Sequence, residues 1–177
     1  RQKVPLLQDG DFCIGESAAI VAYLSRMYST TERALIPEAT RDYAAWLSLW
    51  ADDGIYAIPI DPTADDLADL LNYAYDDAAM RRMRVARLTS GESMSARDAA
   101  NTLRSVSRFR LLDADADGAT RVRCAQNLVE YRRGTFRTYA ANVTYALRRE
   151  GGEIRLTEKT VRLLNSTDAL AGMSFLL

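Results

Sequence analysis

The feature that most constrains the fold of this chain is a two-residue hydrophobic alternation through most of its C-terminal half. Four long segments carry the alternation, and each is separated from the next by a short polar stretch that contains glycine. The segments are 103–112, 120–131, 135–147 and 153–164. Alternation places apolar side chains on one face of a strand, and short glycine-containing connections join antiparallel neighbours. The pattern predicts an antiparallel meander of four long strands.

Helical periodicity precedes the predicted sheet. Residues 39–53 carry large apolar side chains three or four positions apart, a spacing that gives a helix one apolar face. These side chains are Tyr43, Trp46, Leu47 and Trp50. Residues 55–60 then read as a short strand that ends at Pro59, and residues 61–66 read as a turn.

A second helix is predicted to begin at Asp76 and Asp77 and to end at Gly91, with its acids first and its cations later, as the helix dipole favours. The cations are Arg81, Arg82, Arg84 and Arg87. Its buried contacts are expected from Met80, Met83, Ala86 and Leu88. Because the net charge of the chain is −1, we interpret the arginines as a solvated face or as a patch that pairs with acids on a partner subunit. The same balance gives no overall attraction to nucleic acid.

Strands of this length curve, and a curved sheet needs its concave face covered by other elements. The two predicted helices are available to cover it. We therefore predict an α+β fold: a cone-shaped, curved antiparallel sheet packed on helices around a pocket.

The N-terminal residues have a different pattern. Residues 4–7 and 12–14 read as two strands joined by a turn that contains Asp-Gly, and a helix over 17–28 follows. No apolar run approaches the roughly 20 residues that cross a bilayer, so no membrane association is expected. No secretory signal is recognised, and the first residue is Arg1. The two cysteines lie far apart, which suggests no disulfide framework and favours a cytoplasmic location.

The absence of histidine excludes several kinds of site within the chain. With no histidine and two cysteines, the chain cannot build a Ser-His-Asp or Cys-His nucleophile. It also cannot build a two-histidine-one-carboxylate iron site or a Rieske cluster. We expect no metal or cofactor site of its own, and any chemistry would rest on carboxylates, tyrosine, lysine, cysteine or backbone groups.

Three N-terminal motifs, Lys-Val-Pro-Leu-Leu, Asp-Gly-Asp-Phe and Glu-Ser-Ala-Ala-Ile-Val-Ala-Tyr-Leu, lie within residues 1–37. Together they resemble the N-terminal domain of glutathione transferases. The resemblance implies a partial thioredoxin-like fold and a set of glutathione-binding positions: Val4, Pro5, Glu16 and Ser17. A helix N-terminus with a hydroxyl is a physically suitable anion site, although Glu16 and Ser17 also read as a simple helix cap. A glutathione-binding or transferase-related protein is therefore one alternative.

A longer series of motifs occupies residues 38–177. It includes Trp46-Leu47, Trp50-Ala-Asp-Asp, Tyr75-Asp-Asp before the arginine-rich helix, and the closing Ser-Phe-Leu-Leu. In order and spacing the motifs resemble the small (beta) subunit of aromatic-ring-hydroxylating dioxygenases, enzymes of aromatic hydrocarbon catabolism. The resemblance implies a nuclear-transport-factor-like cone that is non-catalytic. It also implies a large (alpha) partner subunit holding a Rieske [2Fe-2S] cluster and mononuclear iron, and a hexamer of three large and three small subunits.

Cone folds also host small isomerases and dehydratases that use a carboxylate base and a tyrosine donor in an apolar pocket. Asp52, Asp53 and Tyr56, near the predicted cone mouth, are candidates for such a set, although they also read as a helix-end cap and a packed tyrosine. Residues 113–118 match the first half of a calcium-binding loop. The twelfth position of that loop, however, is Cys124 instead of the glutamate that calcium needs, so a hairpin turn is predicted. Cys124 itself is interpreted as a small buried hydrophobe.

Overall fold

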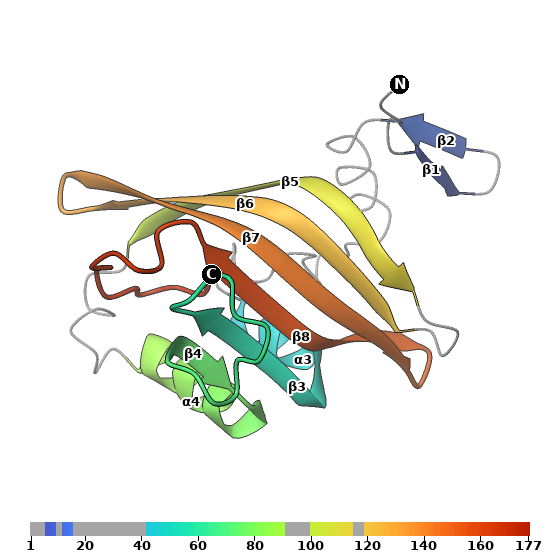
Figure 1. Cartoon of the computed structure of the whole chain (residues 1–177), viewed down its shortest axis with the longest axis horizontal. Coiled ribbons are helices and arrows are strands. Elements are labelled where there is room, and N and C mark those ends of the chain that lie inside the picture. The colour runs from blue at the N-terminus through green and yellow to red at the C-terminus, as the bar shows by residue number, and fades with distance from the viewer. Residues whose placement is uncertain (1–5, 10–11, 16–41, 91–99, 115–118) are drawn as a thin grey trace.

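The computed structural model describes residues 6–9, 12–15, 42–90, 100–114 and 119–177. Within these residues the main body is a six-stranded curved sheet in the order β4-β3-β8-β7-β6-β5. Figure 1 shows both helices on the same side of that sheet. The helices are α3 (Tyr43–Ser48) and α4 (Ala78–Thr89). The strands are β3 (Trp50–Pro59), β4 (Asn72–Asp76), β5 (Asn101–Ala114), β6 (Thr120–Arg132), β7 (Thr135–Glu150) and β8 (Glu153–Leu163).

The predicted meander is confirmed, because β5, β6, β7 and β8 pair antiparallel in sequence order. The sheet as a whole is nevertheless mixed, since β3 joins β8 in parallel, which corrects the expectation of a wholly antiparallel sheet. Strand β4, which the sequence analysis missed, pairs antiparallel with β3 at the edge. The parallel pair joins segments about a hundred residues apart, and hydrophobic periodicity carries no information on such a contact.

The helix predicted over residues 39–53 is shorter than expected. Asp42 caps α3 by accepting the N–H of Ala45 at 3.0 Å, and the chain becomes strand β3 at Trp50. Trp46, Trp50 and Tyr56 form an edge-to-face cluster with ring centroids 5.4–6.1 Å apart. The helical spacing of the two tryptophans was therefore misleading: they meet because a helix turns into a strand, and aromatic packing overrides local propensity.

Helix α4 is confirmed, with Asp77 as its N-cap accepting the N–H of Met80 at 2.8 Å. Its buried face, however, differs from the prediction. Met80, Met83 and Ala86 are exposed, whereas Arg81 is buried and Val85 and Leu88 pack against the core. The side of α4 that faces the sheet is therefore the one that carries Arg81, and the methionines point elsewhere.

The predicted N-terminal hairpin is also confirmed. Strands β1 (Leu6–Asp9) and β2 (Phe12–Gly15) pair antiparallel as a separate two-stranded sheet. The helix expected over 17–28 lies outside the described residues, so the division of the chain at residues 37 and 38 stays a prediction. None of the helices in the described part is long and apolar enough to cross a membrane.

Candidate functional site: the interior of the cone

A row of large polar side chains crosses the concave face of the sheet. Tyr56 on β3 is in register with Asp76 on β4 and with Lys159 on β8, and Lys159 is in turn in register with Tyr145 on β7. Asp76, Tyr56 and Lys159 are fully buried. The ammonium of Lys159 lies 5.8 Å from the Tyr56 ring centroid and 5.7 Å from that of Tyr145, within the range of cation–π attraction.

Arg84 on α4 neutralises the carboxylate at one end of this row. Its Nη2 donates to Asp76 Oδ1 at 3.0 Å, and its Nε donates to Asp76 Oδ2. The hydrogen bonds to Asp76 raise the pKa of Arg84 above its ordinary value. The interpretation of the arginines as a solvated face or a partner-binding patch is therefore wrong for Arg84 and Arg81, which bind partners within the chain. Arg82 and Arg87 are exposed, as both alternatives require, and the choice between the two stays a prediction.

Residues 170–177 fill the rest of the interior. The Tyr56 hydroxyl accepts the N–H of Leu177 at 3.1 Å and donates to the main-chain oxygen of Leu177 at 3.2 Å. Arg104 on β5 donates to the carbonyl oxygen of Leu176, and Phe175 packs edge-to-face on Tyr139 with centroids 5.4 Å apart. Phe175, Leu176 and Leu177 are all buried, so this segment closes the concave side that the two short helices leave open.

Replacing Tyr56 by phenylalanine is expected to reduce the free energy of unfolding by about 1–2 kcal/mol, because both hydrogen bonds to Leu177 are lost in a buried site. Urea denaturation measures this change. Tyr131→Phe is the matched control. The Tyr131 ring is exposed and packs against Phe136 at a tilt, so removal of its hydroxyl should change the free energy of unfolding by less than about 0.5 kcal/mol. Equal stability of Tyr56→Phe and wild type would show that the hydroxyl does not anchor the segment.

The space that remains is a cavity of about 240 Å³ between Tyr56, α4 and the 170–177 segment. Its polar lining comes from Tyr56, Tyr73 and Arg84, and no carboxylate side chain lines it. Tyr73 donates to the carbonyl oxygens of Ser166 and Asp168. Of the three residues proposed as a pocket set, the structure places only Tyr56 in the cavity wall.

Asp52 and Asp53 lie in a bulge of β3 and are exposed. Trp50 pairs with Leu156 and Ile55 with Glu158, so β3 advances five residues while β8 advances two. The extra residues loop out of the sheet and carry both carboxylates away from the interior. Arg148 on β7 binds Asp53 through both terminal nitrogens, at 2.9 and 3.2 Å, and these hydrogen bonds hold the pKa of Asp53 below its ordinary value. The structure therefore does not bring these acids together with Tyr56.

Arg81 on α4 binds the backbone of the same bulge from the interior side of the sheet, a role that the sequence analysis did not predict. It donates to the carbonyl oxygen of Ala51 at 3.1 Å and to that of Gly54, and its guanidinium lies 4.4 Å from the Trp50 ring centroid. Burial lowers the pKa of Arg81 from its ordinary value. The Arg81 side chain thus supplies hydrogen-bond donors to the carbonyl oxygens of the bulge. The sequence indicates this role only by placing Arg81 on the same face of the helix as Val85 and Leu88.

Cys124 is buried on β6, as predicted, and burial raises the pKa of its thiol to about 11. In a Cys13→Ser variant at pH 8 we expect alkylation by iodoacetamide to be at least about a hundredfold slower than in the urea-unfolded chain, since the reactive thiolate is scarce and covered. Mass spectrometry of timed aliquots gives both rates. Equally fast alkylation of the folded protein would contradict the buried position.

The four glutathione-binding positions implied by resemblance, Val4, Pro5, Glu16 and Ser17, lie outside the described residues. In the part of the chain that the structure describes, no three His, Cys, Asp or Glu side chains gather closely enough to hold a metal ion.

Comparisons with known proteins give a family for the chain. The sequence model of the ring hydroxylating beta subunit family matches residues 39–168, and that of the glutathione S-transferase N-terminal domain matches residues 1–26. The small oxygenase component of the p-cumate 2,3-dioxygenase system of Pseudomonas putida is 33% identical over 118 residues. That match spans 64% of this chain and 64% of the relative's length.

Two solved structures show how widely the fold is used. The beta subunit of the benzoate 1,2-dioxygenase of Burkholderia mallei superposes with a TM-score of 0.65 at 22% identity, covering 91% of this chain and 97% of that one. LinA type 2, a hexachlorocyclohexane dehydrochlorinase, superposes with a TM-score of 0.54 at 17% identity, covering 88% and 91%. These likenesses confirm the cone fold, and the family match over most of the sequence shows that the chain belongs to the ring-hydroxylating beta subunit family.

Proposed function

We propose that this chain is the non-catalytic small subunit of a Rieske-type aromatic-ring-hydroxylating dioxygenase and supports its assembly with a catalytic large subunit. Membership of the beta subunit family supports this proposal, as does the likeness to the small oxygenase component of a dioxygenase system. The large subunit would hold the Rieske cluster and the mononuclear iron, and the complex would work in the cytoplasm on an aromatic compound.

The observation that carries the non-catalytic role is the way the interior is filled. Enzymes that act on small-molecule substrates need a concave site with polar side chains that converge on the substrate. Here residues 170–177 occupy the concave side, Asp76 is engaged by Arg84, and Asp52 and Asp53 point to solvent. Among the described side chains, no carboxylate beside Tyr56 is free to act as a base. A scaffold needs only a rigid body with outward surfaces.

Co-expression with the large subunit from a neighbouring reading frame tests the proposal. We expect the two chains to co-purify, with a mass that fits a hexamer of three large and three small subunits. An Asp53→Asn variant of the small subunit should leave the turnover of the complex unchanged. Turnover of an isomerase or dehydratase substrate by the isolated chain, abolished by Asp53→Asn, would contradict the proposal.

The match of residues 1–26 to the glutathione transferase domain favours one alternative, glutathione binding. A glutathione-affinity column distinguishes the two functions. If the column retains the wild-type chain but not the Glu16→Ala variant, glutathione binding is supported. If the wild-type chain passes through without retention, glutathione binding is contradicted and the assembly role remains.

A further inference from the structure

The cavity of about 240 Å³ between Tyr56, α4 and the 170–177 segment is large enough for a small ring compound. Most of the side chains that line it are apolar, and they come from parts of the chain that lie far apart in sequence. The apolar lining includes Ile58, Leu88, Leu170, Met173 and Phe175. An apolar cavity of about 150 Å³ already holds benzene. The cavity therefore has room for a six-membered ring with a short substituent.

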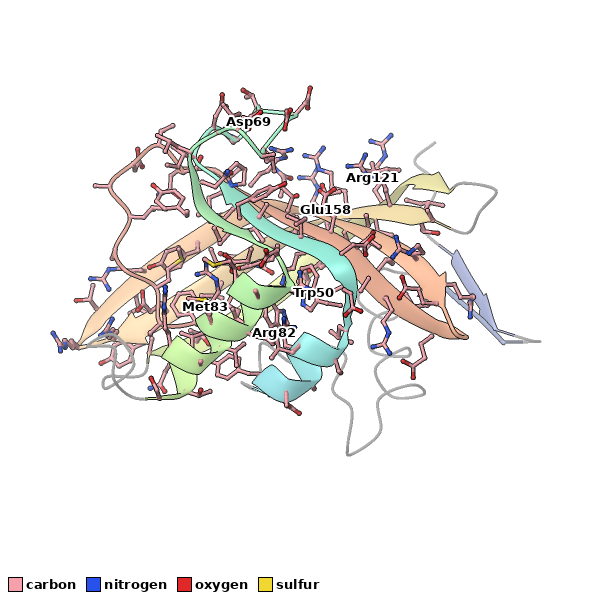
Figure 2. The ribbon with its side chains drawn as sticks, turned by 90° about the horizontal axis from the view of Figure 1, so that it is seen from below. Trp50, Asp69, Arg82, Met83, Arg121 and Glu158 are labelled. Atoms are coloured by element: carbon pink, nitrogen blue, oxygen red, sulfur yellow. The ribbon has the colours of Figure 1, made fainter. Side chains whose placement is uncertain are left out.

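A second hollow, of about 140 Å³, joins the cavity to the surface. Both spaces are lined by Arg84, Leu88 and Met173, so they adjoin. The outer hollow is also lined by Met80 and Met83, which are 40% and 47% exposed. Figure 2 shows Met83 on the flank of α4 that faces the C-terminal segment of the chain, as this shared lining requires. Because methionine side chains are unbranched and flexible, a small molecule can enter between them.

The cavity offers no uncompensated charge to a ligand. Among the described side chains that line it, Arg84 alone carries a charge. Buried Asp76 accepts two hydrogen bonds from Arg84, one of them from Nη2 at 3.0 Å, and so balances it. A charged ligand would lose its hydration in the cavity without gaining a free counter-charge. The site therefore suits a neutral ligand.

Two polar groups in the cavity wall have unused hydrogen-bonding capacity. Arg84 binds Asp76 through Nε and Nη2, and its Nη1 donates to no acceptor in the described part of the chain. The Tyr73 hydroxyl donates to the main-chain oxygens of Ser166 at 2.7 Å and Asp168 at 3.3 Å. It accepts no hydrogen bond from the described residues, so its lone pairs remain available. A hydroxyl group suits this pair of partners because it both donates and accepts.

We propose that the cavity binds a small neutral alcohol or phenol built on a single ring. The ring packs against Leu88, Met173 and Phe175, and the hydroxyl donates to the Tyr73 oxygen and accepts from Nη1 of Arg84. Because no carboxylate among the described side chains lines the cavity, the site binds this ligand without a base to transform it. The inference goes beyond the proposed function and does not rest on it, since the described walls of the cavity belong to this chain.

Isothermal titration calorimetry of the full chain with benzyl alcohol tests the proposal. We expect a dissociation constant of about 1 mM or below, the range for a well-fitted ligand of about eight non-hydrogen atoms. A purely apolar cavity would prefer toluene, because a hydroxyl without a partner is costly to bury. Here benzyl alcohol should bind at least as tightly as toluene, and negatively charged benzoate should bind at least about tenfold more weakly. Benzyl alcohol at about ten times its dissociation constant should raise the melting temperature by about 3–5 °C.

Tyr73→Phe tests the polar contact, because it removes the hydroxyl and keeps the ring. It should weaken the binding of benzyl alcohol about fivefold and change that of toluene by less than about twofold. Tyr131→Phe is the matched control: its ring is exposed and does not line the cavity, so it should change neither affinity. Equal weakening of both ligands by Tyr73→Phe would show that Tyr73 only supports the fold.

Leu170→Trp locates the site, because the larger side chain occupies the cavity that Leu170 lines. The binding of benzyl alcohol should fall at least about tenfold. Leu164→Trp makes the same change at a position that is 70% exposed and outside the cavity, and should bind like wild type. If melting shows that Leu170→Trp does not fold, Ile58→Phe fills the cavity from the opposite wall and replaces it. Four results would overturn the proposal: no binding by wild type, tighter binding of toluene, tighter binding of benzoate, or undiminished binding in the folded, filled variant.

Discussion

Replacing Arg81 by alanine is expected to lower the free energy of unfolding by about 3–5 kcal/mol. The side chain is 3% exposed and donates to two carbonyl oxygens of the β3 bulge, those of Ala51 and Gly54. Its removal takes the side-chain donor from two buried carbonyls, removes a cation from the face of the Trp50 ring and opens a cavity beside that ring. Urea denaturation followed by tryptophan fluorescence measures the loss, since Trp50 reports directly on the site.

Arg82→Ala is the matched control, because it removes the same charge from the next position of the same helix. That side chain is exposed, and its loss should change stability by less than about 0.5 kcal/mol in the isolated chain. The free energy of unfolding of Arg81→Lys should lie between those of Arg81→Ala and Arg82→Ala. A lysine ammonium can donate to one of the two carbonyl oxygens, but it lacks the planar, two-pronged geometry of the guanidinium. If Arg81→Ala and Arg82→Ala were equally stable, Arg81 would not hold the bulge.

Replacing Gly54 by alanine is expected to cost about 3 kcal/mol. A Cβ at this position would lie 2.7 Å from the carbonyl oxygen of Leu156 and 2.9 Å from Cε3 of Trp50. One obstacle is backbone of β8 and the other is a buried ring, so neither can move without disturbing the parallel β3–β8 pair. Position 54 needs glycine because the backbone of β8 approaches it closely. This close approach lets β3 resume its pairing with β8 at Ile55, where the bulge ends.

Gly172→Ala is the control for this substitution. A Cβ at Gly172 meets nothing within 4 Å, and the residue lines the 240 Å³ cavity. We expect its stability to stay within about 0.5 kcal/mol of wild type. Thermal melting of both variants, followed by circular dichroism, makes the comparison. If Gly54→Ala and Gly172→Ala melted at the same temperature, the close approach of β3 and β8 at Gly54 would not contribute to stability.

The sequence predicted the elements whose cause is local. Alternation located all four meander strands, and the Asp76-Asp77 pair located the start of α4, because strand faces and helix caps follow from neighbouring residues. Cys124 was correctly predicted to be buried. The bulge was missed: Trp50 continues the helical spacing of Trp46, and only the contact with β8 makes it part of a strand.

The candidate site depended still more on the tertiary structure. The sequence placed Asp52, Asp53 and Tyr56 within five residues, yet the bulge turns both acids outward while Tyr56 faces the interior and binds Leu177, 121 positions away. Likewise, the spacing of Met80 and Met83 suits a buried face, but the guanidinium of Arg81 lies inward because the bulge carbonyls need a donor.

By itself, therefore, the sequence determined the family, the strand order of the meander and the exclusion of histidine-based sites, since all three depend on residue identity and on neighbours along the chain. The tertiary structure alone decided which polar side chains are buried, how the cone interior is filled and which faces remain open for docking. Those properties depend on contacts between residues far apart in sequence, where burial energy and hydrogen-bond satisfaction outweigh local preference.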